Sequence, residues 1–200
     1  MRRRPWCWWN VPAERRQANP RAPTARVFFA LWPPTEVAWQ LSTVADSFAA
    51  QAGGKATRRE TIHLTLAFIG DVPVERLPDL ERAARKVRAE AFDLTLDQFG
   101  FWYHNQIFWA GYSVVPLALV ELASALGAAM QAAGFDVADA RRNFTPHVTL
   151  VRKVKALGTP LPPGQRLPWR CTKFVLLRSQ LSASGASYQT LAEFPLSGRR

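Results

Sequence analysis

A six-residue pattern occurs twice in this 200-residue sequence, and the repetition limits the folds open to the chain. Residues 61–66 read Thr-Ile-His-Leu-Thr-Leu, and residues 145–150 read Thr-Pro-His-Val-Thr-Leu. The two histidines of the pattern, His63 and His147, are two of only three in the chain. Two copies with matching flanks indicate a duplicated unit and predict a two-lobed, pseudo-twofold architecture.

Each copy reads as part of a β-strand, because apolar residues alternate with His and Thr. Successive side chains of a strand point to opposite faces of the sheet. The residues expected on the core face are Ile62, Leu64, Leu66 and Phe68 in the first copy and Val148 and Leu150 in the second. The residues expected on the opposite face are His63, Thr65, His147 and Thr149.

The rest of the pattern predicts more strands than helices, with the helices interleaved singly. Runs typical of strands cover 26–32, 61–70, 92–99, 107–112, 144–151, 173–181 and 188–194. Helical spacing predicts helices from Thr35 (as the cap) to Gly53, over 77–87 and over 117–133, and 155–168 reads as a long loop. We expect 107–112 to be the antiparallel partner of 92–99. The order predicts an α+β fold with mostly antiparallel sheets, outer helices and a catalytic cleft between the two lobes.

Positive charge is unevenly distributed along the chain. The sequence has 26 Lys and Arg against 15 Asp and Glu, which suits a polyanionic partner such as nucleic acid, although Arg-rich composition alone does not establish one. Residues 1–25 are rich in Arg and Trp and show no helical or alternating pattern. We therefore interpret 1–25 as a flexible basic arm, 26–196 as a single bilobal domain and 197–200 as a tail.

Several functional classes find no support in the sequence. No apolar stretch approaches the roughly 18 residues that span a bilayer, and no glycine-rich loop of the nucleotide-binding types occurs. The cysteines, Cys7 and Cys171, have no metal-ligand spacing, and neither motif contains an acidic residue or a further histidine. We expect a cytoplasmic monomer that needs no metal or other cofactor, no membrane and no protein partner.

The repeated His and Thr side chains fit acid–base chemistry at phosphorus. Imidazole transfers protons well near neutral pH, so two of them across one phosphorus can act as a base and an acid. Threonine hydroxyls can bind the non-bridging oxygens, and an arginine can add charge stabilisation. A single His-x-Thr is most simply a chance arrangement, but two copies with matching faces favour a catalytic pair.

These motifs resemble the two HxTx signatures of the 2H phosphoesterase superfamily, and within it the RNA 2′,3′-cyclic phosphodiesterases, also called 2′-5′ RNA ligases. The resemblance covers about residues 25–196. It includes the opening strand from Arg26, the stretches 62–70, 108–111 and 144–152, and Leu177-Arg178-Ser179 with Tyr188. It implies a bilobal α+β fold and hydrolysis of an RNA 2′,3′-cyclic phosphate end to a 2′-phosphomonoester.

The resemblance also implies roles for individual residues. His63 would be the general acid toward the 3′ oxygen and His147 the base that positions water, with the roles exchanged in the ligating direction. Thr65, Thr149 and Arg152 would bind the phosphate. Arg152 has the parity of the core-facing Leu150, so it reaches the site only if the strand ends or bulges near Val151.

Phe28 is a candidate base-stacking platform, because Phe29 is expected on the core face and Phe28 then points the other way. The alternative is that Phe28 is an ordinary core residue. His104, in the segment Trp102-Tyr103-His104-Asn105, is expected in an exposed turn. For the whole chain, two further readings stay open: a phosphodiesterase acting on small cyclic phosphates or 2′-5′ oligonucleotides, and a non-catalytic basic RNA-binding module.

Overall fold

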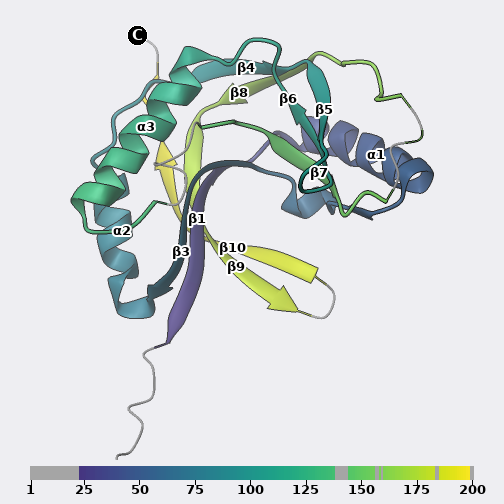
Figure 1. Ribbon diagram of the computed structural model, residues 1–200. Helices are drawn as coiled ribbons and strands as arrows, with labels where there is room; N and C mark the ends of the chain where they lie inside the picture. Colours follow the sequence, from purple (N-terminus) through teal and green to yellow (C-terminus); the bar gives the residue numbers. More distant parts are fainter. Residues whose placement is uncertain (1–22, 138–143, 156–157, 159, 183–184, 199–200) are drawn as a thin grey trace, which may run out of the picture.

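The computed structural model describes residues 23–137, 144–155, 158, 160–182 and 185–198 (Figure 1). The strands are β1 (Thr24–Leu31), β2 (Lys55–Ala56), β3 (Leu64–Pro73), β4 (Phe92–Leu96), β5 (Gln98–Trp102), β6 (Ile107–Gly111), β7 (Val148–Arg152), β8 (Leu167–Cys171), β9 (Lys173–Ser182) and β10 (Gly185–Pro195). The helices are α1 (Thr35–Ala52), α2 (Leu77–Ala84) and α3 (Leu117–Ala132), with 3₁₀ turns at Arg59–Thr61 and Val74–Arg76. The predicted α+β fold with mostly antiparallel sheets is confirmed.

One large sheet joins the two halves of the molecule. Its strand order is β10-β9-β1-β3-β7-β6-β5, and the short strand β2, outside this order, also pairs with β7. The motif strands β3 and β7 are neighbours and pair antiparallel at Leu64 and Val148. Helix α1 contacts β7 and helix α3 contacts β3, so each half's helix covers the other half's motif strand (Figure 1). The two halves therefore share one continuous sheet rather than facing each other as separate ones.

The two faces of this sheet are covered differently. The main core contains buried residues from all three helices together with strand residues such as Phe29, Leu64 and Leu150. The opposite face has a small second cluster made only of strand residues and Trp32, which follows β1: Phe28, Ala30, Val175 and Leu177, with Trp32, Phe68 and Tyr188 packed against them. The helices thus lie on one face and leave the other to the aromatic cluster.

The structure corrects the expected strand between 92 and 99. The chain breaks at Asp97, whose carboxylate accepts hydrogen bonds from the backbone N–H and hydroxyl of Ser113 at 2.7 and 2.6 Å. Strand β5 after this break pairs with β6, whereas β4 before it pairs with β8 in a separate two-stranded sheet. Strand β8 starts inside the segment expected to be a loop, where Leu167, Trp169 and Cys171 alternate as buried residues.

Bulges also change which face a residue occupies. In β3, Ala30 of β1 pairs with Thr65 but Phe29 pairs with Ala67, so Leu66 is an extra residue. As a result both Leu66 and Ala67 are buried in the main core, and the face of the next residue is reversed. Phe68, expected beside Leu66, lies instead in the cluster on the opposite face.

The ends of the domain extend slightly past the expected boundaries. Strand β1 begins at Thr24, which pairs with Pro73, and Ser197 forms a parallel bridge with Glu90. Helix α1 starts at Thr35 itself, with Pro34 rather than Thr35 in the cap position. The greater part of the expected basic arm, residues 1–22, lies outside the described residues. Among the helices that are described, none is long and apolar enough to cross a membrane.

Candidate active site

The two motif histidines lie diagonally opposite each other where β3 meets β7. His63 comes directly before β3 and His147 directly before β7. Because Leu64 pairs with Val148, the antiparallel register continued by one residue sets His63 beside Thr149 and His147 beside Thr65. The core-facing partners Leu64 and Val148 are fully buried, as expected from the alternation.

Each histidine is fixed by the same backbone contact. His63 Nδ1 lies 2.8 Å from the carbonyl oxygen of Thr61, and His147 Nδ1 lies 2.8 Å from that of Thr145. A carbonyl oxygen can only accept, so both Nδ1 atoms carry the hydrogen and donate it. In the neutral ring, Nε2 is then the nitrogen with the basic lone pair in both histidines. The motif's first threonine therefore sets the tautomer through its backbone.

His63 is enclosed by aromatic rings. Its ring centroid lies 5.0 Å from Phe28, 5.1 Å from Tyr188 and 6.1 Å from Trp32. Burial is the main cause that lowers the pKa of His63 to about 4, and electrostatic interactions with Arg152 and then His147 also lower this pKa. The hydrogen bond to Thr61 opposes the shift. The free protein therefore holds His63 neutral at neutral pH.

His147 has an aromatic neighbour of its own, Trp102 of β5, which in turn packs against Trp109 of β6. The Trp102 ring stands edge-on to the His147 ring at 4.5 Å, and Trp102 lies 5.4 Å from Trp109. Trp109 pairs with Gly100 on one side and with Thr149 on the other. A side chain at Gly100 would overlap the Trp109 indole, so this glycine makes room for the ring.

Arg152 reaches the site because β7 bulges. Phe108 of β6 pairs with Val151 while Trp109 pairs with Thr149, which leaves Leu150 as the extra residue. Leu150 and Val151 are both fully buried, and the parity of the next residue is reversed. Arg152 therefore shares the face of Thr149, and its charge acts on both His63 and Tyr188. The bulge near Val151, which Arg152 needs in order to reach the site, is therefore present.

Phe28 lies on the expected face, beneath the catalytic candidates. Its ring is 4% exposed and packs against His63 and Tyr188, both at 5.0 Å between centroids. A nucleobase could stack on it only after one of these two rings moved aside. His104 is exposed in the turn after β5, as expected.

Several residues of the site were missed from the sequence. The repeated Thr61 and Thr145 were visible in both copies, but only the fold shows that their carbonyls hold the histidines. Trp102 was placed in a loop, although it alternates with Gly100 along β5. Tyr188 was included in the resemblance but was given no place in the site, since β10 meets β1 only through β9. No group of three His, Cys, Asp or Glu side chains in the described part of the chain could hold a metal ion.

This arrangement brings two imidazoles, two threonines and an arginine to one face of adjacent strands. Two Nε2 lone pairs held in the same tautomer can accept or, once protonated, deliver a proton. The arginine and hydroxyl groups can bind an anion between them. The chemistry that this set supports is proton transfer at an anionic centre.

Comparisons with known proteins agree with this site. A family model described as LigT like phosphoesterase matches residues 31–109. The RNA 2′,3′-cyclic phosphodiesterase of Escherichia coli (strain K12) is 32% identical over 86% of this chain and 96% of its own length. The Thermus thermophilus protein of the same name is 31% identical over 86% of this chain and 91% of its own length.

A solved structure adds the fold to the sequence similarity. The crystal structure of E. coli LigT complexed with 3′-AMP superposes with a TM-score of 0.80 at 30% identity, covering 87% of this chain and 99% of that one. The likeness thus extends over both motif copies and the sheet that joins them. The resemblance noted from the HxTx motifs is confirmed: the chain belongs to the LigT-like phosphoesterases of the 2H family.

Proposed function

We propose that this protein hydrolyses RNA 2′,3′-cyclic phosphate ends to 2′-phosphomonoesters by acid–base catalysis between His63 and His147, without a metal. The observation that carries the proposal is the matched pair of Nδ1–H bonds to the carbonyls of Thr61 and Thr145, because it gives both rings the same reactive nitrogen. The names of the curated relatives support the RNA cyclic phosphate as the substrate class.

The reaction needs one proton accepted and one delivered. His147 Nε2 accepts a proton from water as the water oxygen attacks phosphorus. The bond from phosphorus to the 3′ oxygen breaks, and protonated His63 delivers its Nε2 proton to that oxygen. The product has a 2′-phosphomonoester and a 3′-hydroxyl, and exchange with solvent restores the two protonation states. A 5′-hydroxyl that replaces water, deprotonated by His147 as it attacks phosphorus, would give a 2′-5′ linkage with the same loss of the 3′ oxygen to His63, and the histidines exchange roles when that linkage is cleaved back to the cyclic phosphate.

The role of His63 as general acid requires a protonated ring, which the bound phosphate favours and the free protein does not. His63 is neutral in the free protein because burial and the charge of Arg152 disfavour its protonated form. A phosphate anion bound between Arg152 and His63 cancels that positive field and favours the protonated ring. Thr65 and Thr149, which are half-buried on the same face, hold the non-bridging oxygens.

The choice of substrate distinguishes the proposed function from the two alternative functions. A phosphodiesterase for small cyclic phosphates would process a free nucleoside 2′,3′-cyclic phosphate as well as a cyclic-ended RNA, whereas an RNA-binding module would process neither. A 2′-5′ oligonucleotide provides the third substrate. The intact pair of motifs supports the catalytic readings over the binding module.

Product analysis tests the proposal directly. A short RNA with a 2′,3′-cyclic phosphate end is incubated with the protein in excess EDTA, and the phosphate position in the product is assigned by phosphorus NMR. We expect complete conversion to the 2′-phosphate. A 3′-phosphate product would show that the other bond breaks, and activity lost in EDTA and restored by a divalent cation would falsify the metal-free mechanism.

A further inference from the structure

Two positively charged residues are register partners where β2 pairs with β7, next to the proposed catalytic face. Lys55 of β2 pairs directly with Arg152 of β7, and both side chains are exposed. Neither forms an ion pair with any residue that the structure describes. Like charges directly opposite in an antiparallel pair are destabilising, so a bound anion between them would relieve an existing repulsion.

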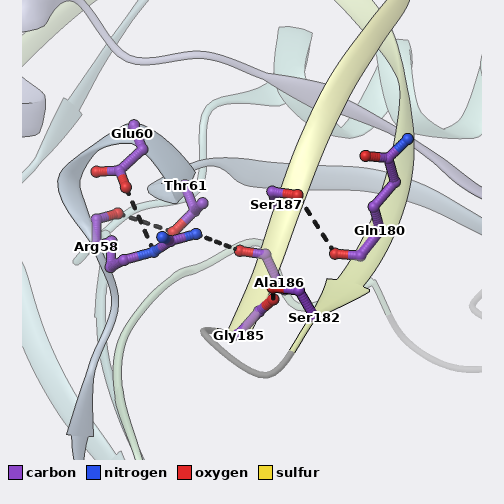
Figure 2. Close-up of polar contacts among 8 residues, drawn as sticks. All are labelled: Arg58, Glu60, Thr61, Gln180, Ser182, Gly185, Ala186 and Ser187. Atoms are coloured by element: carbon purple, nitrogen blue, oxygen red, sulfur yellow. Dashed lines mark hydrogen bonds and ion pairs between the residues drawn. The ribbon is translucent and has the colours of Figure 1, made fainter.

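A third cation is fixed at the same place. Arg58 Nη2 donates a hydrogen bond to the carbonyl of Ala186 at 2.6 Å, and its Nε lies 3.3 Å from the carboxylate of Glu60 (Figure 2). The Thr61 hydroxyl donates to the carbonyl of Arg58 at 2.8 Å and holds this turn beside the start of β10.

Lys55 reaches the same end of β10. A Cβ atom built on Gly185 would lie 3.2 Å from the Lys55 ammonium nitrogen, and Gly185 is the neighbour of the Ala186 that Arg58 contacts. The ammonium and guanidinium groups therefore converge on two consecutive residues. Glu60 neutralises part of the charge of Arg58 and none of the charge of Lys55.

Tyr188 connects these cations to the catalytic histidine. Its ring lies 5.1 Å from the ring of His63. Burial raises the pKa of Tyr188, and the charges of Arg152 and Arg58 both oppose that shift, so the two guanidinium groups lie near this side chain. Arg152, Arg58 and Lys55 thus place three cationic side chains on the side of the site next to His63 and Tyr188.

We propose that Lys55 and Arg58 form a second phosphate site, which binds the backbone phosphate next to the reacting cyclic phosphate in an RNA strand. The proposal rests on the proposed function and adds a preference for oligonucleotides over single nucleotides. A nucleoside cyclic phosphate has only the reacting phosphate, for which Arg152 is already in place. A second phosphate is what would engage the remaining cations.

The test compares two substrates in one variant. Turnover of a cyclic-ended dinucleotide, which has one internal phosphate, is measured against turnover of a nucleoside 2′,3′-cyclic phosphate. Lys55→Gln should lower kcat/KM on the dinucleotide by about fivefold more than on the mononucleotide, as expected for an exposed charge pair. Equal losses on both substrates, or no loss on either, would overturn the site.

Three further variants separate binding from structure. Glu60→Gln frees Arg58 and should raise kcat/KM on the dinucleotide, and a decrease would contradict the proposal. Arg58→Gln should lower kcat/KM more on the dinucleotide than on the mononucleotide, as Lys55→Gln does. An equal loss on both substrates would mean that Arg58 only holds the start of β10 in place. Lys86→Gln, a change to an exposed lysine after α2, is the matched control and should alter neither substrate.

An RNA-binding measurement tests the second phosphate site independently of catalysis. Affinity for a short RNA with a 2′-phosphate end is measured by fluorescence anisotropy over a range of salt concentrations. The slope of log affinity against log salt should fall by about 0.7 for each lost contact in Lys55→Gln. An unchanged slope and affinity would overturn the second site, even if the protein turned over neither cyclic substrate and the proposed function had failed.

Discussion

Leu64 and Val148 form the register pair that joins β3 to β7, and each directly follows a motif histidine. The pair is fully buried against the helices, so the packing of the main core fixes the relative position of the two strands. The histidines one residue earlier are then held on the opposite face without any direct contact between them being required. The core thereby orients the two histidines that we propose as the catalytic pair.

The titration of His63 reports on the electrostatics of the site. We expect NMR to give a pKa of about 4 for His63 in the free protein, because the ring is buried and electrostatic interactions with Arg152 and His147 disfavour its protonated form. Arg152→Gln removes one of these charges and should raise the pKa, and saturating inorganic phosphate should also raise it in the unmodified protein. A His63 pKa near 6.5 that neither change moves would contradict the arrangement.

Stability should depend on pH through the same residue. The folded pKa of about 4 lies below the ordinary histidine value of 6.5, so the unfolded chain binds more protons between these values. The contribution of His63 is fully present above pH 6.5 and is lost as the pH falls toward 4, by up to about 3 kcal/mol. Urea unfolding across this window measures it. His63→Gln should flatten this part of the profile, and a slope unchanged by the substitution would refute the linkage.

Trp102 is expected to position His147 rather than to touch the phosphate. Its ring lies edge-on to His147 at 4.5 Å, and replacing it by leucine allows the imidazole to rotate about its bond to the backbone. Trp102→Leu should lower kcat by about tenfold with little change in KM, whereas Trp102→Phe should restore most of the rate. A change in KM alone would indicate a substrate contact instead.

Gly100 limits what can be placed beneath Trp109. A methyl group at this position would overlap the indole, so Gly100→Ala should destabilise the protein by about 1–3 kcal/mol through overpacking. Gly127→Ala, where an added methyl meets nothing within 4 Å, is the control and should not destabilise α3. Equal stability of both variants would show that Trp109 is not held against Gly100.

Much of the site was predictable because the repeated motif combines chemistry with strand periodicity. Alternation placed Leu64, Leu66, Val148 and Leu150 in the core, and all four are buried. What alternation cannot predict is a bulge. The extra residue at Leu66 moved Phe68 to the opposite face, and the one at Leu150 brought Arg152 into the site.

Strand partners were less predictable than the strands. The segment around Asp97 reads as one continuous strand. The break at Asp97 coincides with hydrogen bonds that its carboxylate accepts from Ser113, sixteen positions further along the chain, which a local pattern does not reveal. Strand β8 was hidden because its flanking Pro and Gly residues are typical of loops. The aromatic neighbours of the histidines come from β1, β5 and β10, which local patterns cannot bring together.

The central claim is that His63 and His147 act as one unit on a single phosphorus, and single-turnover rates on a cyclic-ended RNA test it most directly. The variants are His63→Gln, His147→Gln and the double substitution, with circular dichroism to confirm folding. We predict that each single change lowers the rate by about a thousandfold and that the double change costs little more, as for groups that work together. A single variant that keeps its rate within tenfold of the unmodified protein would contradict the paired mechanism.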